Sequence, residues 1–194
     1  MRIISGKFRG RKLIKFNKEG IKPTTDKMRE SVFNIVISYL KINEKKNNLP
    51  LEHFNVLDIF AGTGALGLEA ISRGAEKVTF IEKSRDNLRV LYKNTDLLEI
   101  KEKVKIIKKS IRNVKKIEGQ FDLIFMDPPY QMDLIIKKTL KKILDFKIIK
   151  KETIIYWNNL ISKILIKYYD HSSLKYFTKT SNKINKYYID NNRL

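Results

Sequence analysis

The hydrophobic pattern of this chain alternates between short apolar runs and longer stretches with helical spacing. Apolar, β-prone runs bounded by turn residues are typical of buried strands, whereas apolar residues three and four positions apart are typical of amphipathic helices. By these criteria we expect strands over 54–60, 77–82, 103–107, 121–130 and 152–157, and helices over 66–74, 84–100 and 132–144. Because strands and helices alternate, the pattern predicts right-handed crossovers and a parallel sheet covered by helices.

The N-terminal residues have a pattern of their own. The first fifteen predict a hairpin that turns near Gly6–Gly10. Residues 22–40 then predict a helix, with Thr24 or Thr25 as its N-cap and Asp26 in its first turn.

The remaining segments set the domain organisation. Residues 173–190 hold two β-like runs around Ser181–Asn182 and are expected to close the sheet antiparallel. The polar, proline-ended stretch 41–50 is the expected linker. The sequence therefore divides into an N-terminal extension, 1–50, and an α/β domain, 51–194.

Composition narrows the class of protein. The 194 residues include no Cys, which excludes a disulfide scaffold, a thiolate zinc site and a cysteine nucleophile. No uncharged apolar run approaches the roughly 18 residues that span a bilayer, and the first residues lack the apolar core of a signal peptide. His53 and His171 stand alone and suggest no metal site. We therefore expect a soluble, cytoplasmic protein without a metal.

The net charge of +20 is partly compositional, since Lys, Ile and Asn supply 75 of the 194 residues. Its distribution is more informative. Residues 1–50 carry +9, 101–151 carry +9 and 152–194 carry +4, whereas 51–100 carry −2. A uniform bias would not leave one quarter slightly acidic. The charge thus indicates a polyanionic partner, with a different role for residues 51–100.

A glycine-rich motif, Gly62-Thr63-Gly64-Ala65-Leu66-Gly67, follows the first predicted strand, and Glu82 ends the second. Such glycines let a ligand approach the backbone, and the carboxylate can hold two ribose hydroxyls, so a nucleoside cofactor is predicted. The motif alone does not choose between NAD and S-adenosylmethionine. Asp58, just before the turn, favours the latter, because a carboxylate there would repel a pyrophosphate and attract an ammonium or sulfonium group. The alternative is a glycine turn that serves only packing.

A second motif, Asp127-Pro128-Pro129-Tyr130, ends the fourth predicted strand, at the sheet edge where open α/β folds bind ligands. The two prolines hold the chain extended, so that the Asp127 carboxylate and the Pro128 carbonyl can both accept from one exocyclic amine. Tyr130 can stack on the ring that carries this amine. The alternative is a rigid turn with a core tyrosine.

The predicted hairpin carries six cations and no acid in its first fifteen residues, namely Arg2, Lys7, Arg9, Arg11, Lys12 and Lys15. With Phe8 they suit phosphate contacts and stacking on RNA. A charged edge that discourages strand aggregation is the alternative.

The segments RIISGKFRGRKL, PTTDKMRESVFN, DIFAGTGALGLEAISRGA and DPPY occur in this order and closely resemble the bacterial RsmD family of class I S-adenosylmethionine-dependent methyltransferases. The resemblance covers about residues 1–160. It implies a Rossmann-like fold with a mostly parallel seven-stranded sheet and helices on both faces. It also implies methylation of the exocyclic N2 of one guanine in 16S ribosomal RNA, on small-subunit particles or their assembly intermediates. We expect a monomer.

The resemblance assigns roles to three sets of residues. It implies that S-adenosylmethionine contacts Asp58, Ala61, Gly62, Thr63, Gly64, Glu82, Lys83, Ser110 and Ile111. It implies that the target guanine contacts Asp127, Pro128, Pro129 and Tyr130. On the RNA side, Thr24, Thr25 and Arg29 join Arg2, Lys7, Arg9, Arg11 and Lys12.

The chain also departs from the family pattern. Relatives commonly carry an acidic residue for the cofactor adenine where this chain has Lys108-Lys109-Ser110-Ile111, so Ser110 or backbone groups would take that role. A glutamate frequent after the fifth strand is replaced within Tyr156-Trp157-Asn158-Asn159, and a C-terminal glycine-containing hairpin by Ser181-Asn182-Lys183.

Three other functions fit some of these features. An adenine-N6 methyltransferase would use the same Asp-Pro-Pro-Tyr geometry. A protein glutamine methyltransferase usually has Asn first in that motif, and the +9 of residues 1–50 would serve it poorly. A non-catalytic basic RNA-binding or assembly module would retain only the charge.

Overall fold

The computed structural model describes residues 1–16, 25–40, 49–128, 133–158, 163–170, 173–180 and 183–190. Its helices are α1 (Asp26–Leu40), α2 (Ala65–Ser72), α3 (Arg85–Leu97) and α4 (Asp133–Asp145), with two short 3-10 turns, η1 (Lys101–Lys103) and η2 (Ile111–Asn113). Its strands are β1 (Asn55–Ile59), β2 (Lys77–Ile81), β3 (Val104–Ile107), β4 (Phe121–Met126), β5 (Ile149–Asn158), β6 (Lys163–Asp170), β7 (Ser173–Thr180) and β8 (Lys183–Asp190).

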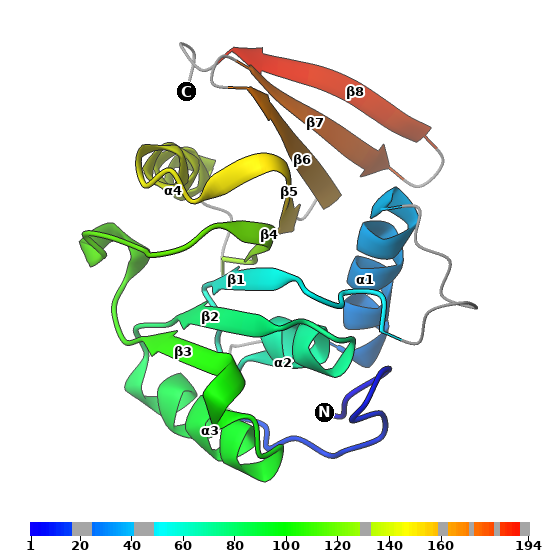
Figure 1. Ribbon diagram of the computed structural model, residues 1–194, viewed down its shortest axis with the longest axis vertical. Coiled ribbons are helices and arrows are strands. Elements are labelled where there is room, and N and C mark those ends of the chain that lie inside the picture. Colours follow the sequence, from blue (N-terminus) through cyan, green and yellow to red (C-terminus); the bar gives the residue numbers. More distant parts are fainter. Residues whose placement is uncertain are drawn as a thin grey trace.

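The described strands form one sheet in the order β3-β2-β1-β4-β5-β6-β7-β8 (Figure 1). Neighbouring strands from β3 to β5 pair in parallel, and β6, β7 and β8 continue the sheet antiparallel. The order reverses at β1, which lies between β2 and β4. In open α/β sheets, ligands bind at the carboxyl ends of the strands beside such a reversal. The topology therefore directs attention to the ends of β1 and β4.

The expected fold class is confirmed, with one difference in the number of strands. The described sheet has eight strands where seven were expected. Strands β7 and β8 are the two runs predicted around Ser181–Asn182, whereas β6 was not predicted. Its apolar run, Ile164–Ile166, has only three residues between lysines, which is too short for periodicity to separate strand from helix. The strand conformation of β6 is instead stabilised by its antiparallel pairing with β5, which the local pattern does not reveal.

Each face of the parallel part of the sheet is covered. Successive residues point to opposite faces of a strand, so Val56 and Leu57 on β1 join different cores. Val56 packs with residues of α1, α2, α3 and the N-terminal segment. Leu57 packs with residues of α4 and of the stretch from Ile111 to Ile117. The same alternation repeats along β2 and β4, which explains why most of their residues are buried and apolar.

The N-terminal residues form the expected turn-back. Arg2 and Lys12 make an antiparallel bridge, and Gly6 and Gly10 between them have φ angles of 81° and 83°. Gly6 also lies against α2, where an added Cβ would stand 1.8 Å from the Ser72 carbonyl oxygen. Only glycine permits both this φ and this approach.

Residues 1–16 and α1 join the core of the α/β unit. Ile3, Leu13 and Phe33 are buried in one cluster with Phe80 and Leu123. Most of the predicted linker, residues 41–48, lies outside the described residues, and the boundary between 1–50 and 51–194 stays a prediction.

Two predicted helix ends are confirmed in atomic detail. Thr25 Oγ1 accepts a hydrogen bond of 3.2 Å from the Met28 N–H at the start of α1, while Thr24 lies outside the described residues. At the end of α2, the Gly74 N–H bonds to the Ile71 carbonyl and the Ala75 N–H to the Ala70 carbonyl. Gly74, with a φ of 106°, thereby completes a Schellman motif. No helix among the described residues combines the length and apolar character needed to cross a membrane.

Candidate functional site

The acidic residues of both motifs come together at the carboxyl edge of the sheet. Asp58 lies on β1 and is in register with Phe80 on β2 and Phe125 on β4. Glu82 follows β2, and Asp127 follows β4. Motifs separated by dozens of residues in the chain therefore end on three adjacent strands, as the parallel order predicts.

The three glycines of the loop have different local environments. Gly62 and Gly64 have φ angles of 56° and 85°, which glycine tolerates without strain. An added Cβ would meet Leu91 at 2.4 Å on Gly64 and Phe80 at 2.2 Å on Gly67, but it would meet nothing within 4 Å on Gly62. Gly67 therefore permits close packing of α2 on β2, whereas Gly62 faces open space that a ligand can enter.

Glu82 ties the glycine loop to the start of α3. Its carboxylate accepts from the Gly62 N–H at 2.8 Å, the Lys83 N–H at 2.7 Å and the Ser84 N–H at 2.6 Å. The residue is only 8 % exposed. A carboxylate offers about four lone-pair positions, so this one retains acceptor capacity for a hydroxyl while its orientation is held by three backbone donors.

Asp58 is buried beneath the loop. Its Oδ2 accepts from the Gly67 N–H at 3.0 Å. Burial, with a smaller contribution from the nearby charges of Asp127 and Glu82, raises the pKa of Asp58 to about 8, against the opposing effect of this hydrogen bond. A cation bound here would reverse this preference for the neutral carboxyl group. The buried carboxyl group of Asp58 and the remaining acceptor positions of Glu82 thus fit a nucleoside ligand that carries positive charge.

Four other predicted cofactor residues have varied environments. Ala61 is buried, and its N–H bonds to the Ile81 carbonyl at 3.1 Å. The Thr63 carbonyl accepts from Asn94 on α3 at 3.4 Å, and the Lys83 side chain is exposed. Ser110 is the N-cap of η2, with its Oγ 3.4 Å from the Arg112 N–H.

Ile111 is 3 % exposed and packs in the core on the α4 side of the sheet. A side-chain contact with the cofactor is therefore not available to it in this structure. Its burial leaves only its backbone, or the half-buried Ser110 beside it, to face a ligand.

The structure describes the first half of the Asp-Pro-Pro-Tyr motif. Asp127 and Pro128 are half-buried directly after β4, and Pro129 and Tyr130 lie outside the described residues. The charge of Asp127 contributes to the raised pKa of Asp58 and to that of Tyr156 on β5. Asp127 therefore lies near enough to Asp58 and to Tyr156 for its charge to raise both pKa values.

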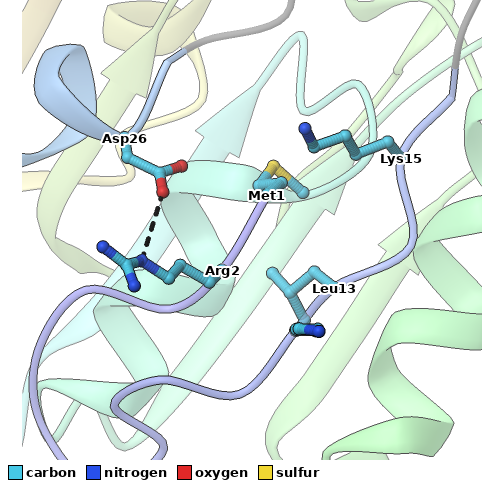
Figure 2. A pocket seen from close by; sticks show the side chains of 6 residues that line it. Met1, Arg2, Leu13, Lys15 and Asp26 are labelled. Carbon is cyan, nitrogen blue, oxygen red and sulfur yellow. Dashed lines mark ion pairs between the residues drawn. The ribbon is translucent and has the colours of Figure 1, made fainter.

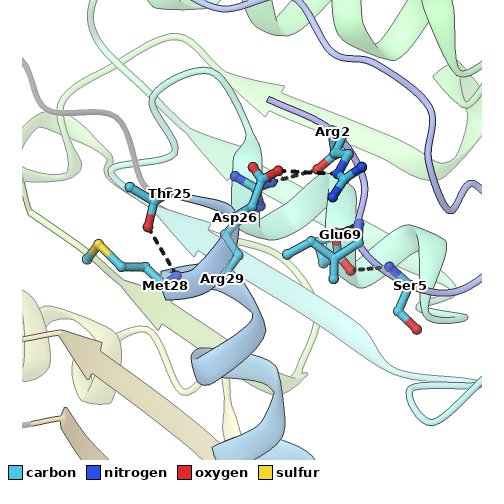
Figure 3. A network of polar contacts seen from close by, with 8 residues as sticks. Arg2, Ser5, Thr25, Asp26, Met28, Arg29 and Glu69 are labelled. Carbon is cyan, nitrogen blue, oxygen red and sulfur yellow. Dashed lines mark hydrogen bonds and ion pairs between the residues drawn. The ribbon is translucent and has the colours of Figure 1, made fainter.

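The cations predicted to bind RNA are exposed, with one exception. Arg2, Lys7, Arg9, Arg11 and Lys12 all have exposed side chains on the N-terminal segment. Arg29 is 1 % exposed. Its Nη2 donates to the Arg2 carbonyl at 2.6 Å and to Asp26 Oδ1 at 2.9 Å (Figure 3). This position differs from that of a surface contact, because the guanidinium instead clamps α1 to the N-terminal segment.

Two grooves run beside this clamp. The larger, of about 560 Å³, is lined by Arg2, Ile3, Ile4, Arg9, Gly10, Asp26, Lys27 and Glu30. The smaller, of about 270 Å³, is lined by Met1, Arg2, Lys12, Leu13, Lys15 and Asp26 (Figure 2). Arg2 lies on both, with its Nε 3.5 Å from Asp26 Oδ2. Arg9 and Lys12 line these grooves together with Asp26, so charges of both signs border them.

Several supporting residues were not singled out from the sequence. Glu69 is fully buried and accepts from the Ile4 and Ser5 N–H groups at 2.8 and 3.0 Å (Figure 3). It also pairs with Arg73 Nε at 3.0 Å. A signal for Glu69 exists, since it is a lone charge among apolar helix positions. For the equally buried Asn94 and Tyr156, the local pattern offers none.

Comparisons with known proteins extend these findings. The family model described as conserved hypothetical protein 95 matches residues 1–188. Ribosomal RNA small subunit methyltransferase D of Haemophilus influenzae is 39 % identical over 138 residues, which cover 69 % of this chain and 66 % of that protein. The protein of the same name from Buchnera aphidicola (strain APS) is 37 % identical over 155 residues, covering 79 % of this chain and 75 % of its own.

A solved structure from Escherichia coli, named as a candidate methyltransferase, yhhF, aligns with a TM-score of 0.69 and 28 % identity. The alignment covers 97 % of this chain and 96 % of that one, so both the sheet and the N-terminal segment have counterparts there. Because the family model matches residues 1–188, the chain belongs to the conserved hypothetical protein 95 family, which includes the ribosomal RNA small subunit methyltransferases D.

Proposed function

We propose that this protein transfers a methyl group from S-adenosylmethionine to the exocyclic N2 of a guanine in 16S ribosomal RNA. The observation that carries the proposal is the gathering of Asp58, Glu82 and Asp127 on three adjacent strand ends, in a chain whose curated relatives are named for small-subunit rRNA methylation. A cytoplasmic monomer acting on small-subunit particles or their precursors is the simplest form of this function.

The cofactor side is supported by the fit of the residues present. S-adenosylmethionine, when bound, supplies an electrophilic methyl group on a positively charged sulfur. Glu82 would hold the ribose hydroxyls with its remaining acceptor capacity, and the open face of Gly62 would let the ligand lie against the loop. Asp58 would become ionised on binding and favour the positive end of the ligand. Ala61, Thr63 and Gly64 would contribute the rest of the loop, and Lys83 would contribute from the turn between β2 and α3.

The substrate side rests on Asp127 and Pro128. The carboxylate of Asp127 and the carbonyl of Pro128 would accept the two N–H groups of the amine, which turns its lone pair toward the methyl group. Acceptors already in place are matched to an amine that becomes positive as the new bond forms. Pro129 and Tyr130 lie outside the described residues, and the stacking of the base on Tyr130 stays a prediction.

RNA docking is supported by charge and exposure. The exposed cations between Lys7 and Lys12 lie on a segment without acidic residues, so they suit contacts with phosphates. The segment is held against α2 by Glu69 and Ser72. A rigid basic edge of this kind would orient the RNA relative to Asp127.

The decisive experiment is methyl transfer to small ribosomal subunits isolated from cells that lack the modification. Digestion of the product and mass spectrometry should find N2-methylguanine at one position. Recovery of N6-methyladenine would instead support the adenine-N6 alternative, and absence of both S-adenosylmethionine binding and transfer would support the RNA-binding module. Asp127→Ala should abolish transfer while S-adenosylmethionine binding, measured by calorimetry, stays measurable.

A further inference from the structure

Tyr156 carries a buried hydroxyl group with no hydrogen-bond partner among the described residues. The whole residue has 0 % exposure. Leaving such a group unpaired is unfavourable, since its bonds to water are lost on folding and not replaced. A phenylalanine would fill the same space without this cost. The hydroxyl therefore calls for an explanation other than packing.

Tyr156 lies on the strand next to the one that Asp127 follows. It lies on β5 in register with Phe125 on β4, and Asp127 is two residues beyond Phe125. Alternate residues share a face of the sheet, so Tyr156, Phe125 and Asp127 occupy positions on the same side.

The ring of Tyr156 is held firmly at this position. It meets the Phe125 ring edge-on with centroids 6.1 Å apart, and Phe125 in turn meets Phe33 of α1 at 5.6 Å. The Tyr156 ring thus ends a row of three aromatic rings, and the hydroxyl is the only polar group of its side chain.

The electrostatics agree with this placement. Burial raises the pKa of Tyr156 well above its ordinary value, and the charge of Asp127 raises it further. The phenol therefore stays neutral and keeps its proton throughout the working pH range. The neutral Tyr156 hydroxyl can therefore act as a hydrogen-bond donor to the nearby Asp127 carboxylate.

We propose that Tyr156 is a positioning residue for Asp127, and that its hydroxyl donates a hydrogen bond to the Asp127 carboxylate when the target base is bound. This inference rests on the proposed function. The hydroxyl would take one lone pair of the carboxylate and leave another directed at the N2–H of the guanine. No proton is transferred between the two side chains. The bond would fix the rotamer of Asp127 and hold it ionised, since a donor to a carboxylate stabilises the charged form.

The test is Tyr156→Phe, assayed in the full-length protein with small subunits that lack the modification. Loss of a hydrogen bond to a charged group predicts a fall in kcat of roughly ten- to a hundred-fold. KM for the subunits and the affinity for S-adenosylmethionine should be unchanged. The melting temperature should be unchanged or higher, because the hydroxyl bonds to none of the residues that the structure describes. Tyr92→Phe, which removes an exposed hydroxyl from α3, should leave kcat unchanged.

A double-mutant cycle with Asp127→Asn tests whether the hydroxyl acts through Asp127. In that background Tyr156→Phe should change kcat by less than about two-fold, since coupled residues are not additive. A wild-type kcat for Tyr156→Phe, or the same loss in both backgrounds, would overturn the inference. Failure of the wild-type protein to transfer methyl groups would instead count against the proposed function, so the two failures are separable.

Discussion

Asn94 pairs with the backbone of Ile14 through both ends of its amide group. Its Oδ1 accepts from the Ile14 N–H at 2.8 Å, and its Nδ2 donates to the Ile14 carbonyl at 3.2 Å. The same Nδ2 lies 3.4 Å from the carbonyl of Thr63 in the glycine loop. Asn94 is fully buried on α3. One side chain thus joins the basic N-terminal segment to the loop that faces the proposed cofactor.

Asn94→Ala should therefore weaken two functions at once. The variant removes two part-buried hydrogen bonds to the Ile14 backbone. At about 0.5–1.5 kcal/mol for each bond, we expect a loss of about 1–3 kcal/mol in the free energy of unfolding. It also releases the Thr63 carbonyl, so the affinity for S-adenosylmethionine, measured by calorimetry at a temperature where the variant is folded, should fall several-fold.

The matched control for this prediction is Thr95→Val. Thr95 is the neighbouring buried residue on α3, and its hydroxyl bonds only to the Tyr92 carbonyl, at 2.8 Å, among the contacts described. This variant should lose stability and keep its affinity for S-adenosylmethionine. Equal losses of affinity in both variants would show that α3 stability alone is responsible.

Gly62 and Gly67 should respond to alanine in opposite ways. Gly67→Ala brings a Cβ within 2.2 Å of the Phe80 ring, and such overpacking costs about 1–3 kcal/mol of stability. Gly62→Ala meets no atom within 4 Å but occupies a φ of 56°, a conformation that costs about 1–2 kcal/mol for a non-glycine residue. Only Gly62→Ala places a methyl group in the open space, so it should weaken S-adenosylmethionine binding more than Gly67→Ala does. The reverse order of affinities would contradict the assigned roles.

Glu69 should be essential for docking of the N-terminal segment. Glu69→Gln removes the charge that faces buried Arg73, and breaking a buried pair in this way costs about 3–5 kcal/mol. Hydrogen exchange should show faster opening at Ile4 and Ser5, whose N–H groups bond to this carboxylate.

The control for Glu69 is Glu118→Gln. Glu118 is exposed and pairs with Lys105 at 3.5 Å and with Lys116 at 3.7 Å, and exposed surface pairs contribute less than about 1 kcal/mol each. Unfolding in urea should separate the two variants clearly. Comparable stabilities for both variants would show that the Glu69 carboxylate does not hold the N-terminal segment in place.

Asp58 should make stability depend on pH. Its pKa is about 8 in the folded protein and near 3.8 when exposed, so the folded state binds more protons between these values. Stability from this group is therefore greatest below pH 4 and is lost progressively as pH rises to about 8. Relative to wild type, Asp58→Asn should gain stability as pH rises through this range. S-adenosylmethionine affinity of the wild type should rise with pH from about 6 to 8, because binding favours the ionised carboxylate; a flat profile would argue against contact with Asp58.

The parallel core and both motifs were predictable because their signals are local. The apolar runs of β1 and β4 and the turn from Gly62 to Gly67 can be recognised within a few residues of sequence. Asn94 and Tyr156 could not be found in this way, because their importance depends on partners brought near by folding: Ile14 is 80 residues from Asn94. Arg29 shows that a local signal in the sequence can also mislead. A cation near a basic segment indicates RNA contact, yet tertiary packing buries it against the Arg2 carbonyl.

The salt dependence of RNA binding tests whether the N-terminal segment docks the substrate. Each cation that neutralises a phosphate releases counterions, so the logarithm of affinity falls with the logarithm of salt concentration. Replacing Arg9 and Arg11, both exposed, by alanine should reduce this slope by about one to two. Lys138 and Lys141 on α4 are also exposed, but we expect them to form a solvated helix face, so their double replacement should leave the slope unchanged. Filter binding to small subunits between low and physiological salt would measure both. If the α4 variant flattened the slope and the Arg9 and Arg11 variant did not, the RNA would dock on the opposite face of the sheet.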